Sequence, residues 1–186
     1  MIGYAFCGSF CTLSASLSAL RGLLAEGLAV QPIMSAATYE TDTRFYPAAA
    51  LREEVETLCG RPIIHTIVEA EPLGPKTPLD FLIIAPCTGN TLAKMAHGIT
   101  DTAVTMAAKA HMRTGRPMLL ALATNDAMSA NLQNLAALSL RKGVYFVPLR
   151  QDDPVAKPAS LVADFTRVGE AYRAAKQGVQ LRPLFL

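Results

Sequence analysis

The chain has 186 residues, of which 51% are hydrophobic and 17% are charged, and its formal net charge is +2. This composition excludes a disordered chain, and the length predicts a single domain that spans residues 1–186 around one core. Lys and Arg are spread along the chain and form no basic run, so we expect no nucleic-acid partner.

Apolar runs and helical periodicities alternate through the first half of the chain. Residues 2–7 form a short apolar run that stops at Gly8, and leucines then recur every three or four residues, which is typical of a strand, a tight turn and a helix. In chain order we predict a strand at 2–7, a helix at 13–27, a strand at 29–34, a loop at 38–44, a helix at 48–59 and a strand at 63–68.

The alternation continues after a proline-rich loop at 71–78. Residues 81–85 are almost wholly apolar, as in a strand covered on both faces, and the run stops at Pro86. Residues 124–126 are expected to cap the helix that follows the next strand. In chain order we predict a strand at 81–85, helices at 91–96 and 102–113, a strand at 118–123, a helix at 128–142, a last strand at 144–148 and a C-terminal helix marked by Leu161, Phe165, Val168 and Tyr172.

Strands that alternate with helices predict a parallel sheet with helices on both faces, a three-layer αβα fold of the flavodoxin-like or Rossmann-like type. In such sheets a ligand binds beyond the carboxyl ends of the strands. Four turns of this chain follow strands and carry glycine, hydroxyl or amide groups: Gly8-Ser9, Ser35, residues 86–91 and Thr124-Asn125. We therefore expect a ligand site where these turns meet.

Two of these turns offer groups that suit an anion. Gly8-Ser9 precedes a helix whose first N–H groups are free to bind a phosphate. In residues 85–91, Thr88 can donate to phosphate, Asn90 can bond a carboxylate or a ring edge, and Thr91 can cap the helix or bind the ligand. This segment is the most informative in the chain.

Residues 85–101 resemble the signature of the homo-oligomeric flavin-containing cysteine decarboxylases, in which a Pro-Ala-Ser-Ala-Asn-Thr segment contacts FMN and substrate. The start of this segment, Pro86-Cys87-Thr88, is similar to that of the flavin prenyltransferases in the same superfamily. Further segments resemble one branch, the dipicolinate synthase B subunits of spore-forming bacteria. These are residues 41–45, 67–76, 124–127, 151–154 and 157–158.

Two departures separate the chain from the decarboxylases it resembles. Their histidine before the strand at 81–85 falls here in Glu71-Pro72, and the nearest histidine, His65, lies much further upstream. Their Pro-Met-Asn clamp is replaced by Ala123-Thr124-Asn125, which retains the amide alone. Decarboxylation of a peptidyl cysteine is therefore not the activity we expect first.

The resemblance implies an FMN site and a part in oxidising a dihydrodipicolinate-type precursor to dipicolinate (pyridine-2,6-dicarboxylate) during sporulation. For this small dicarboxylate substrate, Asn90 and Asn125 are the predicted catalytic amides, Asn125 and Arg44 also bind substrate, and Lys76 is a weaker candidate. The predicted cofactor-binding residues are Gly8, Ser9, Ser35, Pro86, Thr88, Asn90, Thr91 and Thr124.

Partners also follow from the resemblance. It implies a dipicolinate synthase A subunit, with the electron acceptor left open between a flavin on this chain and NAD(P) on that subunit, and it implies a homo-oligomer. An FMN-dependent decarboxylase, a flavin prenyltransferase-like enzyme and a non-catalytic partner of the A subunit stay open as alternatives. The chain shows no secretory signal and no apolar run of the ~18 residues that cross a bilayer, so we expect a cytoplasmic protein, in the mother cell by resemblance, with no membrane contact.

The cysteines and histidines show no metal-ligand spacing, so we expect no metal site and no disulfide framework. Cys87 is the cysteine closest to the predicted ligand site. A thiol next to a cofactor and a helix N-terminus would have a lowered pKa, although a buried, reduced thiol is the more common case.

Overall fold

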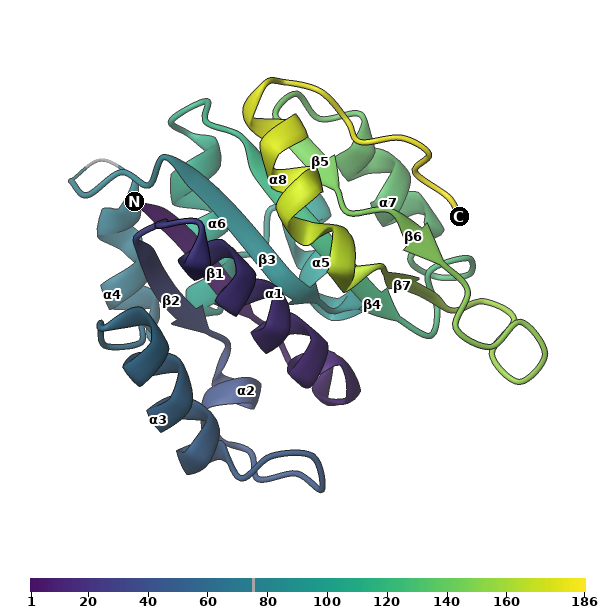
Figure 1. Ribbon diagram of the computed structural model, residues 1–186. Coiled ribbons are helices and arrows are strands. Elements are labelled where there is room, and N and C mark those ends of the chain that lie inside the picture. Colours follow the sequence, from purple (N-terminus) through teal and green to yellow (C-terminus); the bar gives the residue numbers. More distant parts are fainter. Residues whose placement is uncertain (75) are drawn as a thin grey trace.

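The computed structural model describes residues 1–74 and 76–186. Its centre is a seven-stranded sheet in the order β2-β1-β3-β4-β7-β6, with β5 also paired to β4 (Figure 1). The strands are β1 Ile2–Phe6, β2 Val30–Met34, β3 Phe81–Cys87, β4 Met118–Thr124, β5 Val144–Phe146, β6 Leu149–Arg150 and β7 Leu161–Ala163.

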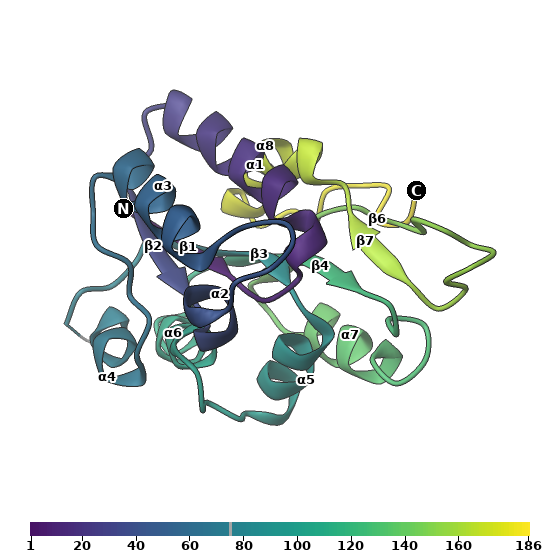
Figure 2. The same cartoon turned by 90° about the horizontal axis from the view of Figure 1, so that it is seen from below.

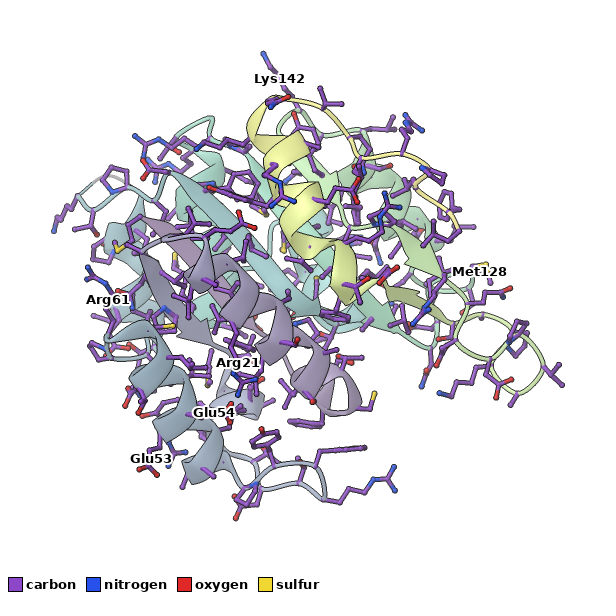
Figure 3. The ribbon with its side chains drawn as sticks, viewed as in Figure 1. Arg21, Glu53, Glu54, Arg61, Met128 and Lys142 are labelled. Carbon is purple, nitrogen blue, oxygen red and sulfur yellow. The ribbon has the colours of Figure 1, made fainter. Side chains whose placement is uncertain are left out.

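Helices cover both faces of the sheet, and the predicted three-layer fold is confirmed. Figure 2 shows α1, α3 and α8 on one face and α4, α5, α6 and α7 on the other. The helices are α1 Leu13–Ala25, α2 Ala36–Glu40, α3 Ala48–Cys59, α4 Ile67–Ala70, α5 Gly89–His97, α6 Ala103–Met112, α7 Leu132–Ser139 and α8 Val168–Lys176. Between α1 and α3, Arg21 and Glu54 point toward each other and form an ion pair (Figure 3). None of the helices described is both long and apolar enough to cross a membrane.

The central strands form the core. Every residue of β3 and all but the last residue of β4 are buried, because helices lie against both faces of these strands. The pairs β1–β2, β1–β3, β3–β4 and β4–β5 are all parallel, as predicted. The carboxyl ends of the first four strands therefore meet at one edge of the sheet.

The last part of the chain differs from the prediction. Residues 144–148 do not form the last strand, since β6 and β7 follow, and β7 pairs antiparallel with both β6 and β4. The sheet is therefore mixed. The C-terminal helix begins at Val168 and not near Leu161, because Leu161 pairs across to Thr124 of β4.

The predicted strand at 63–68 is also wrong. Only Ile64 makes a bridge, to Ile33 of β2, and the chain then turns into the short helix α4. Thr66 caps that helix in a capping box with Glu69, which satisfies the free N–H groups of its first turn. The predicted loop at 38–44 is partly helical, since α2 reaches Glu40. The predicted loop at 71–78 begins with a short 3-10 helix, and its residue 75 lies outside the described residues.

The ends of two predicted elements, near residues 86–91 and near Thr124-Asn125, differ from the prediction. Strand β3 continues through Pro86 to Cys87, with a change of register against β4 after Ile84. Residues 124–126 do not cap a helix. Residues 125–130 form turns, and α7 begins only at Leu132.

Candidate functional site

Four turns meet at the carboxyl edge of the sheet. The backbone N–H of Ser35, after β2, donates to the carbonyl of Phe6 at 3.0 Å, and the N–H of Cys7, after β1, donates to the carbonyl of Pro86 at 3.1 Å. The first three turns are therefore adjacent, as Figure 2 shows from the side of this edge. The convergence that the sequence predicted is present.

The third turn begins α5. Thr88 is the N-cap of this helix, because its hydroxyl accepts from the backbone N–H of Thr91 at 3.2 Å. The same hydroxyl donates to that of Thr91 at 3.1 Å, and Thr91 Oγ1 donates to the sulfur of Cys7 at 3.3 Å. These contacts fix the third turn against the first.

The fourth turn packs on the third through Gly89. A Cβ at this position would lie 2.6 Å from both Thr124 Oγ1 and Asn131 Nδ2. Thr124 donates to one oxygen of Asp126, and Asn131 Nδ2 donates to the other at 2.9 Å. The absence of a side chain at Gly89 therefore allows two turns to approach at the site.

Asp126 holds the fourth turn together and stays ionised at neutral pH. The Thr124 hydroxyl is the main reason that the pKa of Asp126 is lowered, and the Asn131 amide adds to it. Asn131 in turn accepts from Asn134 Nδ2 at 2.9 Å. With both oxygens of Asp126 engaged, its role is to position the turn that carries Asn125.

Most of the predicted hydroxyls serve the turns themselves. Ser35 caps α2 by accepting from the N–H of Thr38, and Thr124 is bonded to Asp126. Ser9 Oγ accepts from Thr12 Oγ1 at 3.1 Å. By contrast, Asn90 and Asn125 are exposed, and their amides bond to no other group in the described part of the chain.

Backbone N–H groups at the carboxyl edge of the sheet are further candidates for ligand binding. Within the described chain, no acceptor is found for the N–H groups of Phe10 and Cys11 at the first turn or of Gly89 and Asn90 at the third. Free N–H groups at helix starts bind anions. These four N–H groups are therefore candidate donors to a phosphate, and the amides of Asn90 and Asn125 can bond carboxylate or ring-edge oxygens.

The thiols at this edge are not activated. Burial raises the pKa of Cys7 to about 11, and burial together with the nearby Cys7 raises the pKa of Cys87 well above its ordinary value. Cys87 is therefore a buried thiol, the more common case that the sequence favoured, because desolvation of the thiolate outweighs any lowering by the helix N-terminus. Among the described residues, no cluster of His, Cys, Asp or Glu could hold a metal ion.

Arg44 lies on the loop between α2 and α3, which projects at the bottom of Figure 1 beyond the carboxyl end of β2. Its guanidinium stacks on the Phe45 ring at 4.8 Å, and both residues are exposed. Thr43 accepts from the N–H groups of Phe45 and Tyr46, which shapes the loop. Lys76 is also exposed.

An aromatic cluster at the end of β2 was not predicted. The His65 ring stacks on the Tyr39 ring at 3.9 Å with an interplanar angle of 7°, and the Arg52 guanidinium lies 4.7 Å from the same Tyr39 ring. Spacing gave no signal for this cluster, because its three members come from three separate elements. Asn131 was not predicted for the same reason. The sequence did show Gly89 in the third turn, but it did not show that Gly89 packs against the fourth turn.

The comparisons with known proteins agree with this geometry. The model of a family described as Flavoprotein matches residues 2–171. The chain is 42% identical over 185 residues to the dipicolinate synthase B subunit of Bacillus subtilis (strain 168), a match that covers 100% of this chain and 92% of the relative. It is 31% identical over 98 residues to flavin prenyltransferase UbiX of Thermoplasma acidophilum, a match that covers 48% of this chain and 54% of the relative.

Solved structures give the same picture. The crystal structure of the dipicolinate synthase B subunit from Bacillus halodurans superposes with a TM-score of 0.91 at 38% identity, over 100% of this chain and 95% of the other. An FMN-dependent cysteine decarboxylase, SpaF, superposes with a TM-score of 0.66 at 23% identity, over 95% of both chains. This second similarity shows a shared fold alone.

Proposed function

This chain belongs to the Flavoprotein family and, within it, to the dipicolinate synthase B subunits, and on that premise we propose that it works as such a B subunit. In this role it takes part in oxidising a dihydrodipicolinate-type precursor to pyridine-2,6-dicarboxylate in the cytoplasm of a sporulating cell. The observation that carries the proposal is the 42% identity with the Bacillus subtilis relative over the full chain.

An FMN-type cofactor fits the carboxyl edge of the sheet. The unbonded N–H groups of residues 10–11 and 89–90 suit a phosphate, and Gly8 keeps the first turn free of a side chain, since an added Cβ would lie 3.4 Å from Ala37 Cβ and Phe10 Cζ. Ser9, Pro86 and Asn90 lie at the same edge, and Ser35, Thr88, Thr91 and Thr124 hold the turns in place. When bound there, a flavin supplies a two-electron acceptor for the hydride that aromatisation removes.

The residues of the chain bind and orient the substrate dianion. We assign one carboxylate of the substrate to the amides of Asn90 and Asn125, which donate hydrogen bonds from neighbouring turns. Arg44, on its projecting loop, supplies a cation for the other carboxylate. Asp126 keeps Asn125 in place, and because its pKa is lowered it does not take up the substrate proton.

The part of the A subunit in the reaction depends on which group accepts the hydride. If NAD(P) on an A subunit takes the hydride, this chain binds and orients the precursor, and if a flavin takes it, this chain performs the redox step. A flavin prenyltransferase-like activity is a second candidate, favoured by the 31% identity with UbiX over 98 residues. Self-association fits the exposed apolar side chains of Leu132, at the start of α7, and Leu140, just after its end.

Reconstitution tests the proposal. The purified chain is mixed with the A subunit, the precursor and a nicotinamide cofactor, and dipicolinate absorbance is followed with and without added FMN. We expect product only when both chains are present. Product from the A subunit alone would contradict the proposal, and prenylation of FMN by this chain alone would favour the second candidate.

Variants then locate the site. Replacing Asn90 and Asn125 together with Ala removes two donors to a charged group, so we expect turnover to fall at least about tenfold. Gln177→Ala, just after α8, is the matched control, since Gln177 is an exposed amide that belongs to none of the four turns. Unchanged turnover in the double variant would move the active site to the partner chain.

A further inference from the structure

A cavity of about 350 Å³ lies at the amino-terminal edge of the sheet, on the side of α5 and α6. Residues 115–116, just before β4, and Gly143, just before β5, form part of its wall. The four turns lie at the other end of β4. A seven-residue strand spans roughly 20 Å, so the cavity is separate from the site at the carboxyl edge.

The walls of this cavity are apolar. Met95 of α5, Met112 of α6 and Val144 of β5 line it, and Ile99 reaches its rim with 47% of its surface exposed. The volume lies in the range of small-molecule sites, which are mostly apolar with a few polar groups that fix orientation. A flat, apolar body fits such walls.

The rim of the cavity is positively charged. No Asp or Glu lines it among the described residues, whereas five cationic residues do: Lys109, Arg113, Arg116, Arg141 and Lys142. Figure 3 shows Lys142 at this end of the molecule, far from Glu53 and Glu54. The contrast with a net charge of +2 for the whole chain shows that positive charge is concentrated at this cavity.

None of these five cations forms an ion pair in the described part of the chain, and Arg116 alone is close enough to a carboxylate, that of Asp80, to lower its pKa. Elsewhere in the described chain some cations are paired, for example Lys94 with Asp101 at 2.8 Å and Arg173 with Glu26 at 2.7 Å. At the cavity, Arg116 donates to the carbonyl of Leu79 at 2.8 Å and Arg141 contacts the sulfur of Met112 at 3.5 Å. Neither contact neutralises the guanidinium charge.

Helix ends account for only part of this charge. Helices α5, α6 and α7 end beside the cavity, and a helix C-terminus carries about half a negative charge that attracts cations. Three such ends offset roughly 1.5 of the five positive charges. The remaining excess is positive, so the cavity attracts anions.

We propose that this cavity is a second binding site, for a small organic anion with a flat apolar body and two or more carboxylate or phosphate oxygens. The body lies against Met95, Met112 and Val144, and the anionic oxygens bond to the guanidinium groups at the rim. An aromatic dicarboxylate and a nucleoside monophosphate share this chemistry. The inference stands on the cavity alone and does not depend on the proposed function.

Calorimetric titration of the full chain tests this inference with three probes: pyridine-2,6-dicarboxylate, AMP, and uncharged pyridine-2,6-dimethanol. We expect saturable binding of one or both anions, weakened by salt, and no binding of the diol. Binding of the dicarboxylate alone would identify a carboxylate site, and binding of AMP alone would identify a phosphate site.

Charge variants locate the binding. Arg113→Gln with Arg141→Gln removes two rim charges and should weaken binding about tenfold or more, while the matched exposed pair Arg61→Gln with Arg150→Gln should change it less than about twofold. The Asn90→Ala/Asn125→Ala variant should keep the binding component that the rim variant loses, and lose only dicarboxylate binding at the carboxyl edge. The inference is overturned if neither anion binds, if the rim variant binds normally, or if binding is lost only with Asn90 and Asn125. It is also overturned if the rim variant changes only association between chains.

Discussion

Replacing Gly89 with Ala tests the packing of the third turn against the fourth. The added Cβ would lie 2.6 Å from Thr124 Oγ1 and Asn131 Nδ2, and 2.9 Å from Asp126 Oδ1. Ordinary contact distances are about 3.5–4.0 Å, so at least one of these atoms must move. Both neighbours are bonded to the Asp126 carboxylate, and displacing either of them weakens a hydrogen bond to a charged group.

The two effects of this substitution have opposite signs. Gly89 does not lie in the left-handed region, so alanine suits its backbone and restricts the unfolded chain, a gain of about 0.4–1 kcal/mol. The loss of a hydrogen bond to a charged group costs about 1.5–3 kcal/mol. The loss is the larger effect, so we expect the free energy of unfolding to fall by about 1–2 kcal/mol.

Urea unfolding followed by circular dichroism measures this change. The control is Gly22→Ala in α1, where a Cβ would meet nothing within 4 Å, and which should stabilise the chain by about 0.5–1 kcal/mol. Adding Thr124→Ala to Gly89→Ala should recover part of the loss, since it removes one of the opposing atoms. The reasoning is refuted if Gly89→Ala stabilises the chain as much as Gly22→Ala does.

Three further changes test the fold. Thr102→Ala removes the capping box of α6 and should lower the free energy of unfolding by about 1 kcal/mol in urea titrations, whereas an unchanged midpoint would contradict the cap. Leu120→Ala, at a fully buried position of β4, should cost about 2–5 kcal/mol by the same measurement, and a cost below about 1 kcal/mol would show that the position is not tightly packed. Burial lowers the pKa of His111, so the unfolded chain binds a proton more readily and stability should fall as pH drops below about 6.5. His111→Gln should reduce the slope of unfolding free energy against pH in this range. An unchanged slope would show that other groups cause the pH dependence.

Local patterns predicted the first strands and helices well. The amphipathic spacing of residues 48–59 gave the bounds of α3, and Gly60 ends this helix in the left-handed conformation. At residues 63–68 the β-branched composition predicted a strand, which is wrong. The capping pattern of Thr66 and Glu69, which indicates a helix start, was present in the sequence. Local composition alone does not separate a strand from a short capped helix.

Contacts between residues far apart in the sequence explain why the other elements were not predicted correctly. Leu161 fitted a helical stripe, but its partner is Thr124, which lies far away in the sequence. The positions of the four turns followed from the order of strands, whereas the use of their side chains did not. The hydroxyls of Ser35, Thr88 and Thr124 turn inward to hold the backbone, which depends on neighbours such as Thr38 and Asp126 that only the folded chain brings into contact.

The pairing of β7 with the carboxyl end of β4 has a consequence for synthesis on the ribosome. Ala123 and Thr124, beside the fourth turn, pair with Val162 and Leu161. Because chains emerge with the N-terminal part first, residues 1–124 leave the ribosome before this segment is available. The edge that carries Asn125 can therefore reach its final form only late in translation.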